Sequence, residues 1–174
     1  RPLKIIQGLQ QDAFTEAGLA TLFGSEYTVT NESDRMGCRF EGPQVEHAKS
    51  ADIVSDAIPL GAVQIPGHGL PIVMLADRQT TGGYTKVGVL TQAAIEALAQ
   101  KAPGSKVRFE RISMKEAVAE LKAARELEAA AAQRRCSWCA RPAAAPAGTA
   151  AQLSNRLKVT VDGKSYDVTC EEIK

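Results

Sequence analysis

The stretch SDAIPLGAVQIPGHGLPIVMLADRQTTGGYTKVGVL, residues 55–90, decides the fold of this chain. It holds two apolar runs, residues 58–65 and 71–76, separated by the turn residues Pro66-Gly67-His68-Gly69. Short apolar runs bounded by Gly and Pro are typical of buried strands. We therefore predict a β-hairpin through the middle of a core, with Gly61 inside its first strand.

The polar octet DRQTTGGY, residues 77–84, follows the second run at once and is the best candidate for a functional site. Gly82 and Gly83 permit backbone angles that are closed to other residues, and they let a ligand approach the main chain. Arg78 offers two parallel hydrogen bonds to a carboxylate or a phosphate. The alternative is an ordinary polar hairpin turn that happens to hold an arginine and two glycines.

Length and composition indicate a globular chain, since 174 residues suffice for one domain of common size with a tail. The formal net charge of +1 gives no basic surface that would favour nucleic acid. No apolar run approaches the ~20 residues of a membrane span, and the start lacks a signal-peptide pattern. The few cysteines favour the cytoplasm. The chain begins with Arg1 rather than Met, so we expect a fragment or a processed chain.

Short strands and two or three helices are predicted around the central hairpin. A helix is expected over residues 14–24 with Asp12 or Thr15 as its cap, another after Thr91, and a third after the capping box Ser113-x-x-Glu116. Strands are expected near residues 3–6, 27–30, 39–40, 86–90 and 107–112. Helices do not alternate with strands as in a doubly wound sheet. The pattern predicts a mainly β fold with a few helices, a barrel or a sandwich of the α+β class.

A second polar cluster, NESDRMGCRFEGP, spans residues 31–43. One interpretation is a ligand loop in which Asp34 and Arg35 make charged contacts. The other is a solvated hairpin with an internal ion pair. His47 follows among polar neighbours, and we interpret it as a surface residue.

The composition changes after residue 128. Residues 129–151 are rich in Ala and Pro and lack larger aliphatic side chains, which is typical of a linker. Residues 156–169, RLKVTVDGKSYDVT, carry the Asp-Gly signal of a β-hairpin. Cys136 and Cys139 have the spacing of half a zinc site or of a redox pair, but no second pair of ligands follows in the sequence. We interpret them as an incidental pair and assign no metal site.

Three stretches resemble the allophanate hydrolase subunit 2 proteins, also called the biotin-dependent carboxyltransferase family. They are residues 25–43 (SEYTVTNESDRMGCRFEGP), residues 55–90, and residues 103–117 (PGSKVRFERISMKEA). The resemblance implies that residues 1–128 form a cyclophilin-like β-barrel, the C-terminal subdomain of a pair. The tail resembles the start of a biotinyl carrier domain at residues 153–174, preceded by a swinging linker at residues 129–152.

The resemblance implies a component of an enzyme that acts on an amide or urea-like small molecule. Family members open 5-oxoproline to glutamate with ATP, or transfer a carboxyl group from carboxybiotin to urea. The implied cofactors are biotin, carried on a partner or on a further carrier domain, and ATP at the level of the whole complex. The implied partners are a protein like allophanate hydrolase subunit 1 and a further enzyme subunit. Neither nucleic acid nor a membrane is expected.

The candidate site joins the two polar clusters. We expect Arg78 and Arg35 to supply positive charge to a substrate carbonyl or carboxylate, with Asp34 orienting an arginine or acting as a base. Tyr84 would close one wall or donate a proton. Hydrogen bonds to the substrate would come from Gln79, Thr80, Thr81, Gly82 and Gly83.

Two other classes of function stay open. The first is a non-catalytic regulatory module that antagonises a kinase inhibitor protein, as one relative in this family does. The second is a peptidyl-prolyl isomerase, which follows from the barrel analogy alone, and a fold does not imply a function.

Overall fold

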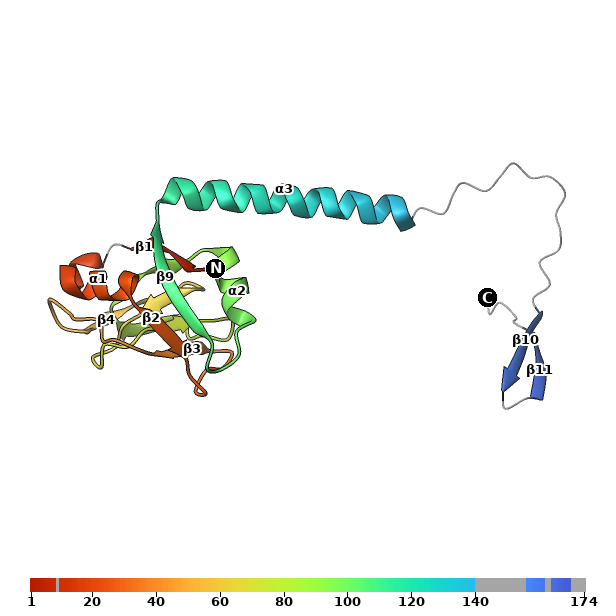
Figure 1. Cartoon of the computed structure of the whole chain (residues 1–174), viewed down its shortest axis with the longest axis horizontal. Coiled ribbons are helices and arrows are strands. Elements are labelled where there is room, and N and C mark those ends of the chain that lie inside the picture. Colours follow the sequence, from red (N-terminus) through yellow and green to blue (C-terminus); the bar gives the residue numbers. More distant parts are fainter. Residues whose placement is uncertain (9, 140–155, 162–163, 170–174) are drawn as a thin grey trace. The chain divides into compact units, whose positions relative to one another are not determined.

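A computed structural model describes residues 1–8, 10–139, 156–161 and 164–169 of the chain (Figure 1). The chain falls into two compact units, Arg1–Ala129 and Ala130–Lys174. The first unit holds the central hairpin and both polar clusters, and therefore the candidate site.

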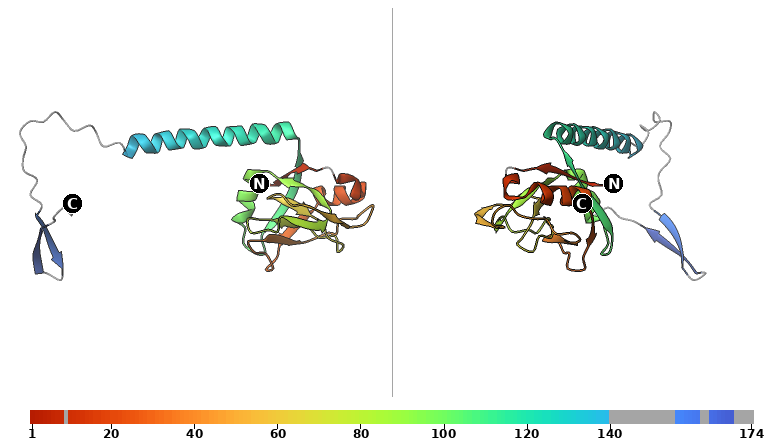
Figure 2. Two further views of the ribbon diagram at one scale, coloured as in Figure 1. Left: turned by 180° about the vertical axis from the view of Figure 1, so that it is seen from behind. Right: turned by 60° about the vertical axis from the view of Figure 1, so that its left-hand side comes forward.

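The first unit is built around a closed β-barrel, which Figures 1 and 2 show from three sides. Its strand order is β1-β8-β5-β6-β3-β2-β9. The parallel pairing of β9 with β1 closes the barrel, and this closure leaves no free sheet edge in it. The mainly β fold predicted from the sequence is confirmed as a barrel. The strands are β1 (Leu3–Gln7), β2 (Glu26–Val29), β3 (Gly37–Glu41), β5 (Ala62–Gln64), β6 (Ile72–Met74), β8 (Lys86–Leu90) and β9 (Lys106–Ile112).

The predicted central hairpin is confirmed as β5 and β6, with Val63 opposite Val73. Its turn is closed by a hydrogen bond of 2.8 Å from the amide of Gly69 to the carbonyl of Pro66. The first strand is shorter than predicted. Gly61 has a φ of 79°, which turns the chain before β5 begins, so residues 58–61 form a loop instead of extending the strand.

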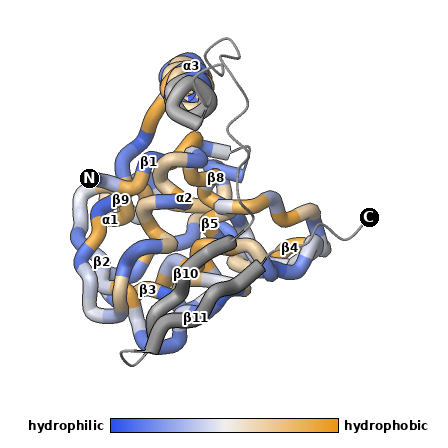
Figure 3. Tube along the Cα trace, turned by 90° about the vertical axis from the view of Figure 1, so that its right-hand side faces the viewer, coloured by the Kyte–Doolittle hydropathy of each residue, from blue (hydrophilic) through white to orange (hydrophobic). Residues whose placement is uncertain are grey.

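Aromatic side chains fill the centre of the barrel. The ring of Phe109 lies 5.6 Å from that of Tyr27 and 5.5 Å from that of Phe40. All three rings are buried, and burial raises the pKa of Tyr27 to about 12. The alternation of apolar and polar residues along the strands, visible in Figure 3, places these side chains inside.

Two short helices lie on opposite sides of the barrel in Figures 1 and 2. Helix α1 (Glu16–Gly24) follows the 3₁₀ turn η1 (Gln11–Ala13). Of the two caps considered, Thr15 is the one used, because its Oγ1 accepts from the amide of Gly18 at 2.9 Å. Phe14 was expected inside this helix, but it lies before the cap. Helix α2 (Gln92–Ala99) is capped by Thr91 as predicted.

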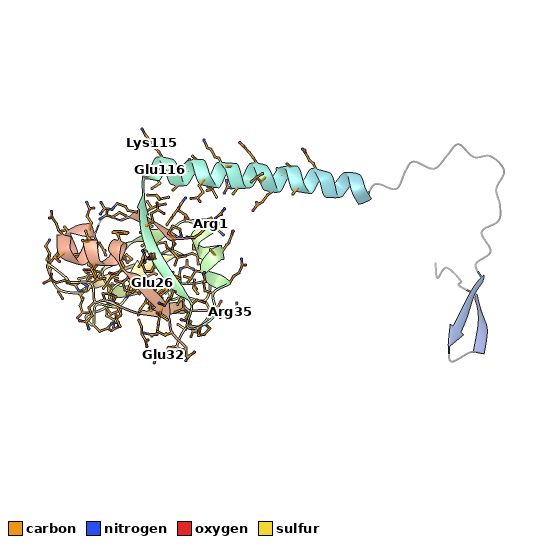
Figure 4. All side chains as sticks on the ribbon, in the orientation of Figure 1. Arg1, Glu26, Glu32, Arg35, Lys115 and Glu116 are labelled. Carbon is orange, nitrogen blue, oxygen red and sulfur yellow. The ribbon has the colours of Figure 1, made fainter. Side chains whose placement is uncertain are left out.

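Helix α3 (Met114–Cys139) begins with the predicted capping box. Glu116, which Figure 4 labels at the start of α3, accepts from both the amide and the hydroxyl of Ser113 at 2.8 Å. The helix continues to Cys139, so the first part of the predicted linker is helical. Alanine has the highest helix propensity of all residues, and a run of alanines therefore extends a helix that has already formed. No helix in the described ranges is both long and apolar enough to cross a membrane.

The second unit holds the predicted tail hairpin. Strands β10 (Arg156–Val161) and β11 (Lys164–Thr169) pair in antiparallel register from Arg156 opposite Thr169 to Val161 opposite Lys164. The hairpin is thereby confirmed, whereas its Asp162-Gly163 turn lies outside the described residues. The division of the chain into barrel, linker and carrier-like tail stays a prediction.

Gly88 tests the close packing of β8 against β1. A Cβ at this position would lie 2.7 Å from Cγ2 of Ile5 and would press on the carbonyl oxygen of Ile6. Since backbone cannot move aside cheaply, we expect Gly88→Ala to lower the free energy of unfolding by about 1–3 kcal/mol. Denaturation in guanidinium measures the change.

The control for Gly88→Ala is Gly24→Ala at the end of α1. A Cβ at Gly24 meets nothing within 4 Å, so this change should stabilise the fold by under about 1 kcal/mol. A Gly88→Ala midpoint at or above that of the wild type would contradict the packing of this seam.

Candidate functional site

The second half of the polar octet is a strand, not part of a turn. β7 (Thr81–Tyr84) pairs with β4 (Asp52–Ala57) in a two-stranded antiparallel sheet, which we call the β4–β7 arm. In the described part of the chain, the arm makes no sheet pairing with the barrel. β4 is exposed along most of its length and lies at the margin of the unit in Figure 3. A two-stranded sheet alone is marginal in water, so the arm depends on contacts with the barrel.

Arg78 connects the loop before β7 to the loop before β5. Its Nε donates to the carbonyl of Ile58 at 3.1 Å, and its Nη1 donates to that of Leu75 at 3.4 Å. The amide of Ile58 in turn donates to the carbonyl of Thr80 at 2.8 Å. The guanidinium carries five N–H groups, so these two bonds position Arg78 and still leave donors for a ligand.

Gln64 lies under the arm, on the outer face of the barrel. Val63 points into the barrel core, whereas Ala62 belongs to a small separate cluster with Ile58 and Met74. Because side chains alternate along a strand, Gln64 shares the outer face with Ala62. Gln64 is only 2% exposed, and its Nε2 is buried without a hydrogen-bond partner among the described residues.

Gly82 of the octet lies directly over this amide. A Cβ on Gly82 would lie 3.4 Å from Nε2 of Gln64 and 2.5 Å from Cδ1 of Ile58. The close approach that was predicted for this glycine is therefore to the barrel surface. Sequence reasoning missed Gln64, because a single amide inside an apolar run predicts only a strand. The signal that could have found it was a polar residue in a strand that is otherwise apolar.

An ion pair brings the two predicted polar clusters together. Arg35 Nε lies 2.9 Å from Oδ2 of Asp77, and Arg35 Nη2 donates to Oδ1 at 3.1 Å. The amide of Asp77 also donates to the carbonyl of Arg35 at 2.9 Å. Figure 4 labels Arg35 at the surface of the barrel unit. The bidentate partner, Asp77, was not among the expected site residues, although it opens the octet.

Asp34 has a different role from the one expected. Its Oδ1 accepts from the amides of Met36 and Gly37 at 2.8 and 3.0 Å, and so it shapes the turn. Among the described residues no arginine is paired with it, so it does not orient Arg35 or Arg78 directly. Its proposed role as a base stays a prediction.

The remaining expected site residues lie along the exposed side of the octet. Gln79, Thr80 and Thr81 are exposed, and Gly83 is partly covered. Tyr84 is 42% exposed and lies opposite Asp52 at the end of β7, about 10 Å along the strand from Thr81. The structure thus gathers Arg35, Asp77 and Arg78 at one end of the octet and leaves Tyr84 at the other.

A second contact holds the arm near its other strand. Lys86 Nζ, on a largely buried side chain, lies 2.7 Å from Oδ2 of Asp56, and Gln10 Nε2 donates to the same oxygen at 3.1 Å. The hydrogen bond from Lys86 is the main cause that lowers the pKa of the Asp56 carboxyl from its ordinary value. Asp56 therefore fastens β4 to the barrel strand β8.

His47 is half-buried, which corrects its interpretation as a surface residue. Its Nε2 lies 3.0 Å from the carbonyl oxygen of Ile65 and 3.2 Å from Oγ1 of Thr85, and its ring packs against Phe14. These contacts tie the segment before β4 to the barrel. Across the described residues, no group of three or more His, Cys, Asp or Glu side chains is placed to hold a metal ion.

The fold and site define a class of protein: a small closed β-barrel with a polar two-stranded arm over its outer face. Over residues 1–111 the chain matches the family model described as carboxyltransferase domain, subdomain A and B. The chain belongs to this carboxyltransferase family.

Two relatives in sequence are both named as the same component of 5-oxoprolinase. The chain is 38% identical over 115 residues to this 5-oxoprolinase component from Haemophilus influenzae, covering 66% of this chain and 37% of that protein. It is 30% identical over 116 residues to the one from Escherichia coli, covering 67% of this chain and 37% of that protein. The chain thus spans about 37% of the length of these curated relatives.

A solved structure shares the fold. Part of the K. lactis urea amidolyase superimposes with a TM-score of 0.63 at 24% identity, over 67% of this chain and 8% of that one. This likeness concerns the fold alone.

Asp56 provides a test of how the arm is held. We expect Asp56→Asn to speed hydrogen–deuterium exchange of the β4 and β7 amides and to leave the barrel amides unchanged, because it removes the charge that Lys86 binds. Exchange read by mass spectrometry measures this. Glu26→Gln is the control, since Glu26 pairs with Lys106 at 2.9 Å within the barrel.

Acid should have the same effect on the wild type. Since the folded pKa of Asp56 is lowered, its contact stabilises the arm above the ordinary pKa of about 4 and is lost as the pH falls through the folded value. Exchange of the arm, corrected for the intrinsic rate, should rise below about pH 4 in the wild type and less so in Asp56→Asn. Equal exchange in both proteins at neutral pH would show that Asp56 does not hold the arm.

Proposed function

We propose that this chain is part of a biotin-dependent carboxyltransferase-type enzyme that acts on an amide or urea-like small molecule. Family membership and the shared name of the two curated relatives support the enzyme class. The observation that carries the site is Arg78, a partly buried guanidinium held by two backbone carbonyls at the base of the β4–β7 arm. Because the chain spans only part of its relatives, the activity belongs to a larger assembly.

Two reactions fit this proposal. One is the ATP-dependent opening of 5-oxoproline to glutamate, and the other is carboxyl transfer from carboxybiotin to urea. Both act at a nitrogen beside a carbonyl group, so both need hydrogen-bond donors where negative charge develops on oxygen. Partner subunits, one of them like allophanate hydrolase subunit 1, would supply the ATP-dependent step.

The residues of the octet have distinct roles in this proposal. Arg78 donates its remaining N–H groups to the substrate carbonyl or carboxylate, and Arg35 adds positive charge beside it. Gln79, Thr80, Thr81 and the backbone of Gly82 and Gly83 supply further hydrogen bonds. Tyr84 closes one wall, while Asp34 keeps the neighbouring loop in shape.

The residues present suit biotin as the cofactor. When bound, biotin would supply the activated carboxyl group, and its ureido carbonyl requires hydrogen-bond donors. Arg78 has N–H groups left for a ligand, and the buried Nε2 of Gln64 is a donor without a partner among the described residues. We propose that a carrier domain presents biotin, either on a partner or continuing from residues 153–174.

A second candidate is a regulatory module that binds a protein instead of transforming a small molecule. The exposed arm favours it, because Val54 on β4 is 92% exposed and the arm presents strand edges that another chain can pair with. Such a module would bind its partner but show no turnover.

Arg78 decides between these candidates. In the complete protein with its partner subunits, we expect Arg78→Ala to lower ATP-dependent glutamate release from 5-oxoproline, or carboxylation of urea, by about a hundredfold or more. Arg78→Lys should also lose most of the activity, because a lysine keeps the charge but lacks the planar fork. Adding avidin shows whether biotin takes part.

The control for Arg78 is Arg108→Ala on the barrel surface, which should keep full turnover. Loss of the carbonyl contacts of Arg78 costs about 1–3 kcal/mol of stability, so the assays belong at a temperature where circular dichroism shows all variants folded. Full turnover of Arg78→Ala would refute the role of Arg78, and partner binding without any turnover would favour the regulatory module.

A further inference from the structure

The buried amide of Gln64 is the polar group in the barrel unit that the fold itself does not explain. A buried N–H without a partner costs about 1–3 kcal/mol, and such groups are rare in folded proteins. Methionine has nearly the same shape and would fill this position without that cost. Gln64 is 2% exposed, so water does not reach it from the surface in this arrangement.

The surroundings of Gln64 do not provide an internal partner either. Its neighbours on the outer face, Ile58, Ala62 and Met74, form an apolar cluster. A buried water molecule needs two to four polar partners, and this cluster lacks them. Gly82 covers the amide with backbone alone, since a Cβ there would collide with Cδ1 of Ile58 at 2.5 Å.

We propose that Nε2 of Gln64 is a hydrogen-bond donor for the carbonyl oxygen of a small amide or ureido ligand, which reaches it when the β4–β7 arm moves away from the barrel. The ligand class rests on the function proposed above. The donor and its cover rest on the structure of the barrel unit.

The arm is built so that it can move. It has no sheet pairing with the barrel in the described residues, and its pairing with itself is irregular between Asp52 and Asp56. Its attachment depends on the contacts of Ile58 with Arg78 and Thr80, and on the ion pair of Asp56 with Lys86. A two-stranded sheet with so few attachments opens at a small free-energy cost.

Ile58 places the two donors on either side of one residue. Its carbonyl accepts from Arg78, and its side chain lies where a Cβ of Gly82 would be, over Gln64. When Ile58 is displaced, an amide N–H and a guanidinium become available next to each other. Two donors of this kind match a carbonyl oxygen, and they bind it more strongly as negative charge develops on it.

A carbonyl of this kind has two possible sources in the proposed enzyme. It belongs either to a substrate such as 5-oxoproline or to the ureido ring of biotin. Both present the same oxygen acceptor, and two separate probes tell them apart.

The first test measures the cost of the buried amide without any ligand. We expect Gln64→Met to raise the melting temperature of the 174-residue chain by about 2–5 °C, because it removes a buried donor that has no partner. The control is Gln44→Met at an exposed position, which should leave the melting temperature unchanged. A Gln64→Met melting temperature equal to or below that of the wild type would overturn the proposal.

The second test measures binding through the melting temperature, with 5-oxoproline and with biocytin added separately in excess. A ligand that binds only the folded chain raises it. We expect one probe to stabilise the wild type and Gln44→Met but to lose this effect in Gln64→Met, and that probe identifies the source of the carbonyl. Stabilisation by neither probe, or equal stabilisation of Gln64→Met, would overturn the ligand class.

These tests fail independently of the proposed function. Turnover assays of Arg78 variants require the complete enzyme, whereas the stability of Gln64→Met is a property of this chain alone. A stabilised Gln64→Met that loses the probe response, together with a fully active Arg78→Ala, would keep the Gln64 site and reject the proposed role of Arg78.

Discussion

The contacts of Ile58 hold the candidate site together. Its amide and carbonyl bind the octet loop at Thr80 and Arg78, while its buried side chain packs under Gly82. These contacts attach an exposed two-stranded arm to a closed barrel, and they place Arg78 beside the outer face of β5. Without them the arm would be an isolated pair of strands, which is marginal in water.

The barrel and the arm divide stability and function between them. The barrel has no free edge, and its aromatic centre is fully packed, so its backbone is a rigid support for the loops. The arm is held by a few hydrogen bonds and one ion pair, and elements of low local stability are the ones that move when ligands bind. The unpartnered amide of Gln64 lies where these two parts meet, and this position connects its energetic cost with binding.

Family membership limits the chemistry without selecting a substrate. The relatives named as a 5-oxoprolinase component and the fold shared with a urea amidolyase agree on a group that acts at amide-type carbonyls. The structural details narrow the site within this family. Arg35 is engaged by Asp77 in an exposed pair, whereas Arg78 is fixed by carbonyl groups and keeps donors for a ligand. For this reason Arg78 carries the functional proposal and Arg35 assists it.

Local sequence signals predicted the central hairpin, the caps at Thr91 and Ser113, and the mainly β fold, because turns, caps and periodicity depend on neighbouring residues. The octet was also found from sequence, since a dense polar run after a buried strand is a local pattern. Only the tertiary structure decided that half of the octet pairs with β4, that Arg35 meets Asp77, and that Gln64 lies under Gly82. These contacts join segments far apart in the chain, and no local pattern encodes which outer-face residue an arm will cover.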